Sequence, residues 1–543
     1  MTLSAILVFT AFAALFRLLA RPRWRGWLLY VASILAVYWL QPAGPVRYLD
    51  FWFPTLTLAL AVCGWALTRQ PGAGGAKEGA HAPEKQGQAG APQQLLRANL
   101  PAAGVLAGLI LLVGLTRFLD VSSLILPSRP PAFEQTVAAV VVAAALALGL
   151  GWLAGRVPPG QKSRAGLLWA SIALLVVLLV VLKAPPLAAA ASAALRDLMN
   201  QSTALAAAGD LRWLGFSYVA FRLIHTLRDR QNGRLPAVTL QEYLVYVIFF
   251  PAFTAGPIDR LERFIKDLRA VPTPAPAPAV APLAGAGAAA PAASVVTAPA
   301  GAGVGLVASQ AWPDWAAAGQ RLTLGLLKKF VVADGLALAA LNATNAAQVN
   351  SAGWAWGLAL AYSLQIYFDF SGYTDIAIGL GRLLGFNLPE NFNAPYFKPN
   401  LTLFWNSWHM TLTNWFRAYY FNPVTRWLRT LKISGGGGLP PQVIIFVTQL
   451  STFVLIGLWH GVTWNFVLWG MWHGVGLFSQ NRWSEAMRPR YAALDARPRL
   501  RQAATLFSTA LTFVYVTLGW VFFALPDPGL SLGVLGKMFG LGA

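Results

Sequence analysis

Two histidines lie among apolar residues in the C-terminal half of the sequence. His460 stands between two strongly apolar runs, in Leu-Trp-His-Gly-Val-Thr-Trp-Asn, and His409 ends the segment Phe-Trp-Asn-Ser-Trp-His. An ionisable side chain at membrane depth is costly and is functional by default. A neutral imidazole can accept a proton, so general acid–base chemistry is a candidate function for such a residue. The alternative for His460 is an imidazole satisfied by an interhelical hydrogen bond, and for His409 it is an aromatic stripe that serves packing.

The other three histidines have simpler explanations. His81 lies in a Gly-, Ala- and Gln-rich stretch, where a solvated loop is expected. His225 lies near two arginines at the end of an apolar run, where a cation at a helix C-terminus is an ordinary explanation. His473 lies 13 residues beyond His460. On one continuous helix these two would point about 140° apart, so we expect His473 to be structural.

The residues around His409 have helical spacing. Asn400 and Thr402 are candidate N-caps. The pattern predicts an amphipathic or partly inserted helix that points His409 inward. Four residues share one face of this helix: Trp405, His409, Thr413 and Phe416.

Two acidic residues, Asp369 and Asp375, lie beside an apolar run. They fall about 120° from a common helix face, so a catalytic carboxylate pair is not expected. Ion pairing, or backbone capping where Gly372 breaks the helix, is the expected role.

The sequence has no HExxH, P-loop or Gly-x-Ser-x-Gly motif, and no metal site is predicted. Its one cysteine, Cys63, excludes an intramolecular disulfide.

The composition indicates what must position these residues. Only 11% of the 543 residues are charged, 57% are hydrophobic, and there are 22 Trp, 14 Tyr and 31 Phe. So few charges could not cover the surface of a soluble protein. The net charge of +21 comes mostly from basic residues between apolar runs, where they meet anionic lipid headgroups. Nucleic acid is therefore not an expected partner.

The apolar runs predict an all-α polytopic protein with roughly 11–13 membrane helices, re-entrant segments included. Thr2–Ala20 lacks the basic start and clear cleavage site of a signal peptide, so we expect a mature helix there. The predicted spans are Thr2–Ala20, Gly26–Leu40, Phe51–Thr68, Leu100–Leu119, Phe133–Ala154, Gly166–Ala184, Leu211–Leu227, Thr239–Gly256, Trp354–Phe370, Val443–Leu458, Thr463–Phe478 and Thr505–Leu525.

Basic residues orient these spans. They follow the first, third, fifth and seventh spans, which predicts that the N-terminus lies outside and that these spans end in the cytoplasm. The alternation fails at Thr239–Gly256, which is followed by the basic segment Arg260–Arg269. Pro251 and Gly256-Pro257 are helix breakers. We therefore expect a re-entrant segment that returns to the cytoplasmic side, buried in protein or lining a wet cavity.

Low-complexity stretches divide the chain. Gln70–Gln94 and Thr273–Gly305 cannot bury a core and are expected to be flexible linkers, and Gly435–Gly438 is a shorter hinge. The expected parts are N-terminal membrane helices at 1–68, a linker at 69–97, membrane helices at 98–227, a re-entrant and cytoplasmic segment at 228–272, an Ala/Pro-rich linker at 273–313 and a C-terminal catalytic core at 314–543.

Several motifs together resemble the membrane-bound O-acyltransferase (MBOAT) family, over roughly Leu211–Leu525. Residues 215–222 (GFSYVAFR) and 255–260 (AGPIDR) look like the branch of the D-alanyl transfer protein of teichoic acids, whereas 368–375 (FDFSGYTD) and 389–395 (PENFNAP) look like the alginate O-acetylation branch. The motifs FWNSWH, ending at His409, and GLWHG, around His460, are similar to both. Both branches usually have Asp after the next arginine, but here Arg417 precedes Ala418.

The resemblance implies residue roles. His460 matches the catalytic histidine of the family, and His409 matches its second active-site histidine. Such enzymes have a membrane-embedded tunnel that admits an acyl thioester from the cytoplasm and an acceptor hydroxyl from the other face. Burial would keep the imidazole neutral and able to act as a base. Candidate substrate-binding residues are Asn406, Asn414, Asn465 and Arg417.

We therefore predict an O-acyltransferase of the cytoplasmic membrane. It would move an acetyl or D-alanyl group from an acyl carrier protein phosphopantetheine, or from acyl-CoA, to hydroxyls of an exported polysaccharide or teichoic-acid-like polymer. No bound cofactor is expected. The expected partners are the bilayer, a cytoplasmic acyl donor, and an envelope polymer or partner transferase outside. The alternatives are a transporter or flippase, which should show repeat symmetry, and a scaffold that relays acyl groups to a separate transferase.

Overall fold

The computed structural model describes residues 2–69, 91–119, 125–156, 162–270, 315–432 and 438–541. Within these ranges the regular structure is helical, apart from an isolated bridge between Lys432 and Gly438. The all-α prediction is confirmed. The linker predicted at 273–313, most of the linker predicted at 69–97 and most of the hinge before Gly438 lie outside the described residues.

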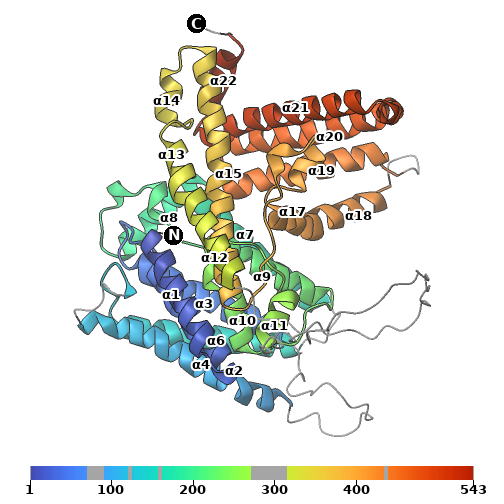
Figure 1. Cartoon of the computed structure of the whole chain (residues 1–543). Coiled ribbons are helices and arrows are strands. Elements are labelled where there is room, and N and C mark those ends of the chain that lie inside the picture. The colour runs from blue at the N-terminus through green and yellow to red at the C-terminus, as the bar shows by residue number, and fades with distance from the viewer. Residues whose placement is uncertain are drawn as a thin grey trace, which may run out of the picture.

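The N-terminal helices are drawn from blue to green in Figure 1. They are α1 (Leu3–Leu19), α2 (Pro22–Leu40), α3 (Leu49–Thr68), α4 (Ala91–Leu115), α6 (Phe133–Arg156), α7 (Lys162–Lys183), α8 (Pro185–Leu198), α9 (Phe216–Gln231), α10 (Leu240–Val247) and α11 (Leu261–Arg269). Helix α4 begins at Ala91, so the end of the predicted 69–97 linker belongs to a helix. Its Ala, Gln and Leu residues are good helix formers.

The C-terminal helices surround the two candidate histidines. They are α12 (Trp315–Leu326), the π-helix η5 (Leu327–Ala333), α13 (Asp334–Ala337), α14 (Ala343–Gln348), α15 (Ala352–Leu383), α16 (Leu401–Trp405), α17 (Met410–Phe416), the π-helix η7 (Arg417–Phe421), α18 (Asn422–Thr430), α19 (Pro441–His460), α20 (Trp464–Ala493), α21 (Pro498–Ala524) and α22 (Pro528–Met538). Helix α15 packs along α12 and η5, and α20 packs between α19 and α21.

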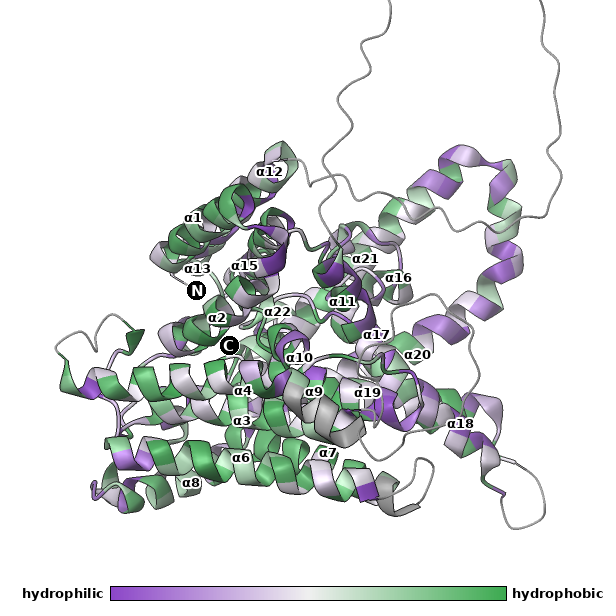
Figure 2. Cartoon of the chain, turned by 90° about the horizontal axis from the view of Figure 1, so that it is seen from below, coloured by the Kyte–Doolittle hydropathy of each residue, from purple (hydrophilic) through white to green (hydrophobic). Residues whose placement is uncertain are grey.

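Six helical stretches among the described residues are long and apolar enough to cross a membrane. The chain is thus a multi-pass membrane protein. Figure 2 shows the apolar character of α3, α4 and α6 and the polar far end of the α20–α21 hairpin. The six stretches are Leu49–Thr68, Ala98–Phe118, Phe133–Arg156, Ala165–Lys183, Pro441–His460 and Pro498–Ala524.

The predicted span Leu211–Leu227 is wrong in its first part. Gly215 adopts a left-handed backbone (φ 72°), and α9 begins only at Phe216. A Cβ at Gly215 would lie 2.8 Å from the Phe253 ring, so the chain turns tightly here against the loop after α10. Most of α9 is buried in protein, including Arg222, which donates to the carbonyl oxygens of Val247 and Ala252.

The segment predicted to be re-entrant folds as a short buried hairpin. Helix α10 ends at Val247, and a 3-10 turn containing Pro251 follows. Residues between these two points are almost completely buried. Helix α11 then returns, and Arg269 at its end pairs with Glu242 in the first turn of α10 at 2.7 Å. The start of α10 and the end of α11 therefore lie together.

Candidate active site

A cavity of about 470 Å³ contains both candidate histidines. His409 comes from the connection between α16 and α17, and His460 is the last residue of α19. Helices α9, α15, α20 and α21 complete the wall, which is largely aromatic. The aromatic lining residues are Tyr218, Phe370, Tyr373, Trp405, Trp408, Trp459, Trp469, Trp520 and Phe523.

His460 is positioned by a break between two helices. Gly461 has an extended backbone, so α19 stops there and α20 starts after Thr463. The carbonyl oxygen of Phe466 would lie 2.1 Å from a Cβ at Gly457, which shows how closely the two helices approach. The His460 ring packs against Trp459 and Phe523, at centroid distances of 4.5 and 4.7 Å.

His473 lies apart from this cavity. The break at Gly461 puts it on α20 rather than on the helix that ends with His460, so the angle expected for one continuous helix does not apply. Its ring is fully buried and lies 4.9 Å from the Trp405 ring. His473 does not belong to the cavity wall.

His409 points inward as predicted, but the predicted continuous helix around it is wrong. His409 has a left-handed backbone (φ 42°, ψ 52°), which divides the segment into α16 and α17. Such a conformation is uncommon for a residue with a side chain and is often found at functional sites. Asn400 caps α16, as expected, because its Oδ1 accepts from Leu403 N at 2.8 Å.

Asn391 holds the His409 ring, a role that no sequence pattern revealed. Its Oδ1 accepts from the Thr411 hydroxyl at 2.6 Å and from Thr411 N at 3.3 Å, and it lies 3.3 Å from His409 Nδ1. Because the backbone N–H of Thr411 donates to this atom, it is the amide oxygen of Asn391 and not the amide nitrogen. An amide oxygen can only accept hydrogen bonds, so the proton of the His409 ring is on Nδ1. The lone pair of His409 is therefore on Nε2.

The surroundings of His409 favour the uncharged form of its imidazole ring. It lies outside the six candidate spans and is 4% exposed. Burial lowers the pKa of His409 to about 3, because the charged form loses its hydration. A lowered pKa means that the ring is neutral at pH 7. The neutral ring can accept a proton from a hydroxyl that is attacking a carbonyl.

The four candidate substrate-binding residues do not line the histidine cavity. Asn406 and Arg417 line an adjacent pocket of about 170 Å³, which shares Trp405, Thr413 and Ile456 with it. Arg417 donates to Asn406 Oδ1 at 2.6 Å and approaches Asn414 Oδ1 at 3.5 Å. These two amides are the side-chain hydrogen-bond partners of Arg417 among the described residues.

Asn465 is used elsewhere in the fold. It is 1% exposed, and its Nδ2 donates to the Leu525 carbonyl at 2.7 Å and to the Ser531 hydroxyl at 2.9 Å. These bonds attach α22 to α20. The structure therefore places Asn465 in the protein interior, outside the cavity wall.

The expectation for His225 is wrong. His225 is not at a helix end but lies within α9, 1% exposed. Its Nε2 lies 2.8 Å from Asp229 Oδ2, and its Nδ1 lies 3.0 Å from the Tyr246 hydroxyl. The Tyr419 hydroxyl donates to the same carboxylate at 2.9 Å. This buried network joins α9, α10 and η7 because each polar group needs a partner where water is excluded.

Asp369 and Asp375 form ion pairs, which was one of their two expected roles. Asp375 pairs with Arg321 and Lys328, and Asp369 pairs with Lys329. The expected helix break at Gly372 is wrong, since α15 continues to Leu383. The glycine serves close packing instead. A Cβ there would lie 2.8 Å from Lys329 N.

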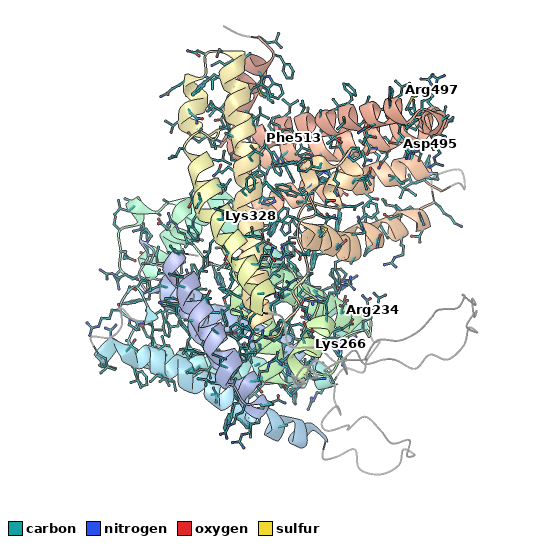
Figure 3. All side chains as sticks on the ribbon, viewed as in Figure 1. Arg234, Lys266, Lys328, Asp495, Arg497 and Phe513 are labelled. Carbon is teal, nitrogen blue, oxygen red and sulfur yellow. The ribbon has the colours of Figure 1, made fainter. Side chains whose placement is uncertain are left out.

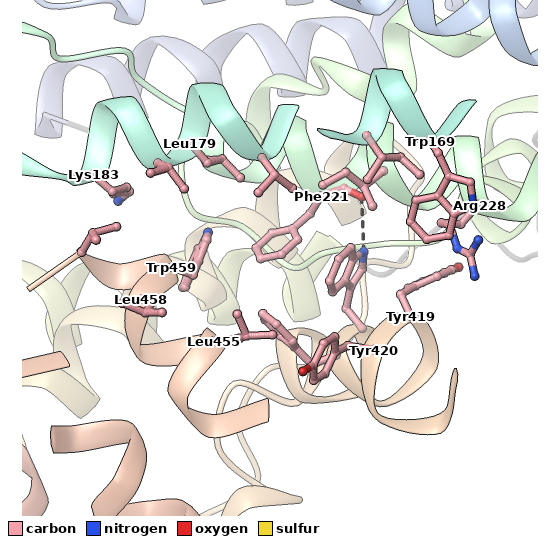
Figure 4. Close-up of a pocket in the computed structure, with 17 residues that line it drawn as sticks. Trp169, Leu179, Lys183, Phe221, Arg228, Tyr419, Tyr420, Leu455, Leu458 and Trp459 are labelled. Atoms are coloured by element: carbon pink, nitrogen blue, oxygen red, sulfur yellow. Dashed lines mark hydrogen bonds between the residues drawn. The ribbon is translucent and has the colours of Figure 1, made fainter. Parts of the chain in front are cut away.

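A third pocket, which is apolar and has a volume of about 340 Å³, adjoins the histidine cavity, and Trp459 lines both (Figure 4). It lies between α7, α9, η7 and α19. Lys183 lies at one end, where its Nζ is 3.5 Å from the His460 carbonyl oxygen. Arg228 lies at the other, stacked on Trp169 at 4.5 Å. The Trp415 N–H donates to the Phe221 carbonyl between them.

The geometry is that of a membrane protein with two histidines in one aromatic cavity. A sequence profile of the membrane-bound O-acyltransferase family, MBOAT, matches residues 173–518. The chain belongs to this family. The match includes His409 and His460.

Known relatives act on different polymers, according to their names. The chain is 27% identical over 277 residues to a teichoic acid D-alanyltransferase of Streptococcus thermophilus, covering 50% of this chain and 58% of that protein. It is 30% identical over 331 residues to a protein of Azotobacter vinelandii named "Probable alginate O-acetylase AlgI", covering 61% and 54%. A peptidoglycan O-acetyltransferase of Helicobacter pylori is 35% identical over 219 residues, covering 40% and 38%. The matches thus cover less than two thirds of each relative.

Proposed function

We propose that this protein is a membrane O-acyltransferase that moves an acyl group from a thioester donor to hydroxyls of a cell-envelope polymer. The observation that carries the proposal is the cavity shared by His409 and His460 in a chain of the MBOAT family. The names of the relatives support acetyl and D-alanyl groups as candidates for transfer.

The chemistry needs a base and an acyl donor. The acceptor oxygen attacks the thioester carbonyl carbon, an imidazole takes the hydroxyl proton, and the C–S bond breaks so that the thiolate leaves and is protonated. General-base assistance contributes typically 10²–10⁴-fold. Among the described residues, the His460 ring has no hydrogen-bond partner, which leaves it free to accept this proton. The donor would be an acyl carrier protein phosphopantetheine or acyl-CoA, delivered from the cytoplasm.

Substitution of the histidines tests the proposal. We expect His460→Ala in the purified protein to abolish acyl transfer to a polymer, and His409→Ala to reduce it severely, by about 10²-fold or more. His473→Ala is the matched control, because it removes a buried histidine outside the cavity, and its effect on turnover should be milder. Size-exclusion profiles in detergent would show that the variants fold. Near-normal turnover in His460→Ala would contradict its role as the base.

A further inference from the structure

The histidine cavity has one charged corner. Apart from the histidines, Lys329 and Asp369 are the only residues with charged side chains among the described residues that line it. Lys329 Nζ lies 2.6 Å from Asp369 Oδ1 and 2.9 Å from Asp334 Oδ1. Asp334 is not part of the cavity wall. The lysine therefore has one carboxylate partner inside the cavity wall and one outside it.

The fold builds this corner with two unusual features. Lys329 lies in the π-helix η5, and such segments are frequent at functional sites. Gly325 and Gly372 face each other where α12 and α15 cross. A Cβ at Gly325 would lie 2.7 Å from the Gly372 carbonyl oxygen. This close crossing brings Lys329 onto the face of α15 that carries Asp369.

Asp369 retains capacity to bind a ligand. Its side chain is 47% exposed, whereas that of its partner Lys329 is 29% exposed. A carboxylate offers about four acceptor sites, and Lys329 uses one of its two oxygens. The remaining sites face water or a ligand. An exposed carboxylate is a natural acceptor for hydroxyl groups of a substrate.

The subsite adjoins the catalytic residues. Phe370 follows Asp369 in sequence, and its ring lies edge-on to the His409 ring at 4.6 Å. Tyr373 and Trp408 line the same cavity and offer flat apolar surfaces. Sugar rings and polyols have C–H faces for such surfaces and hydroxyls for a carboxylate. A hydroxyl-rich chain held at Asp369 would thus enter the cavity that His409 and His460 line.

We propose that Asp369 and Lys329 form the acceptor-binding subsite of this cavity, and that the acceptor is a hydroxyl-rich chain of sugar or polyol units. The Asp369 carboxylate accepts hydrogen bonds from hydroxyls of the chain, while Lys329 fixes the carboxylate and offsets its charge. The catalytic meaning of this subsite rests on the proposed acyltransferase function. The binding itself does not require turnover.

Direct binding is the first measurement. The purified protein in nanodiscs, without donor, is titrated with a mannuronate trisaccharide and, separately, with a glycerol phosphate trimer, which distinguish a sugar ring from an open polyol. We expect at least one probe to bind, and Asp369→Ala to weaken it at least tenfold. Asp334→Ala, the matched control, removes the other partner of Lys329 and should leave the affinity within twofold. Binding of neither probe to the unmodified protein would overturn the proposal.

Kinetics then separates this subsite from catalysis. Asp369→Ala should raise the acceptor KM about tenfold, with the donor KM and the acceptor-free hydrolysis of the thioester within twofold. The proposal would be overturned if Asp334→Ala raised the acceptor KM as much as Asp369→Ala does. It would also be overturned if Asp369→Ala left the acceptor affinity unchanged. If Asp369→Ala does not fold, Asp369→Asn replaces it, with an expected weakening of at least threefold, and unchanged affinity there overturns it equally. Retained oligomer binding without any acyl transfer by the unmodified protein would instead contradict the proposed function.

Discussion

At the scale of single residues, the structure shows how the His409 imidazole is held in one orientation. The left-handed backbone at His409 turns its ring toward Asn391, which accepts from Nδ1 and from Thr411. The backbone N–H of Met410 also donates to the Asn391 carbonyl at 2.9 Å. Asn391 is fully buried, so each of these groups would lack water as a substitute partner. Asn391 is thus a positioning residue for His409.

Asn391→Ala should lower kcat by about 100-fold, because a ring free to adopt the other tautomer spends part of its time with no lone pair on Nε2. The donor KM should change little. Asn393→Ala is a suitable control, since Asn393 is exposed and its backbone N–H, not its side chain, bonds the Ser407 carbonyl. A fall in kcat of the same size in both variants would show that the segment acts only through stability. A conservative Asn391→Ser variant should recover part of the activity.

At the scale of elements, the crossing of α12 and η5 with α15 fixes the charged corner of the cavity. Gly325 and Gly372 permit backbone-to-backbone contact there. Asp375, one turn beyond Gly372, pairs with Arg321 and Lys328 from the opposite element. The crossing combines close packing with ion pairs that are largely shielded from water. The register between the two elements is therefore specific.

Gly372→Ala should destabilise the protein by about 1–3 kcal/mol, the usual cost of overpacking, because the new Cβ meets backbone atoms at 2.8 and 2.9 Å. Gly357→Ala lies on the same helix with open space around its Cβ. It should be neutral or stabilise by up to about 1 kcal/mol, through helix propensity. Thermal unfolding in detergent compares the two. Equal melting temperatures for both variants would show that the crossing tolerates a methyl group.

At the scale of the whole molecule, the charged ends of elements lie on one side. Arg234 and Lys266 lie near each other, and Asp495 and Arg497 mark the far end of the α20–α21 hairpin on the same side of the molecule (Figure 3). Helix α20 has 30 residues, which is about 45 Å and more than a hydrocarbon core of about 30 Å can contain. A helix of this length that crosses the hydrocarbon core would carry its charged end past the core on this side.

We predict that this side is cytoplasmic and that the N-terminus lies outside. In a Cys63→Ala background, Ser202→Cys, between α8 and α9, should react with an impermeant thiol reagent added to intact cells. Asn232→Cys, just after α9, should react only after lysis. Both positions are exposed, so accessibility is matched. The reverse labelling pattern would invert the orientation and contradict donor delivery from the cytoplasm.

Much of this architecture follows from composition and periodicity. Few charges and long apolar runs require membrane helices, whose backbone groups must bond internally in lipid. Pro251 and the displaced basic residues after it predicted a re-entrant segment at Thr239–Gly256, and the structure has the short helix α10 and a 3-10 turn there. The isolated imidazoles of His409 and His460 were recognisable because unpaired ionisable groups are rare in apolar sequence. Each of these properties is local to its segment.

Only the tertiary structure decided which of these residues meet. Asn391 and His409 lie 18 positions apart, and Lys329 and Asp369 come from different elements, so no local period connects them. The chain bends at His409 although the residue spacing there is helical, and α15 continues through Gly372 although glycine disfavours helix. In both places tertiary packing outweighs the local preference. Asn465 and His225 are held by long-range partners that sequence spacing cannot reveal. The sequence alone determined the helices and the candidate bases, while side-chain contacts between distant segments determined the cavity.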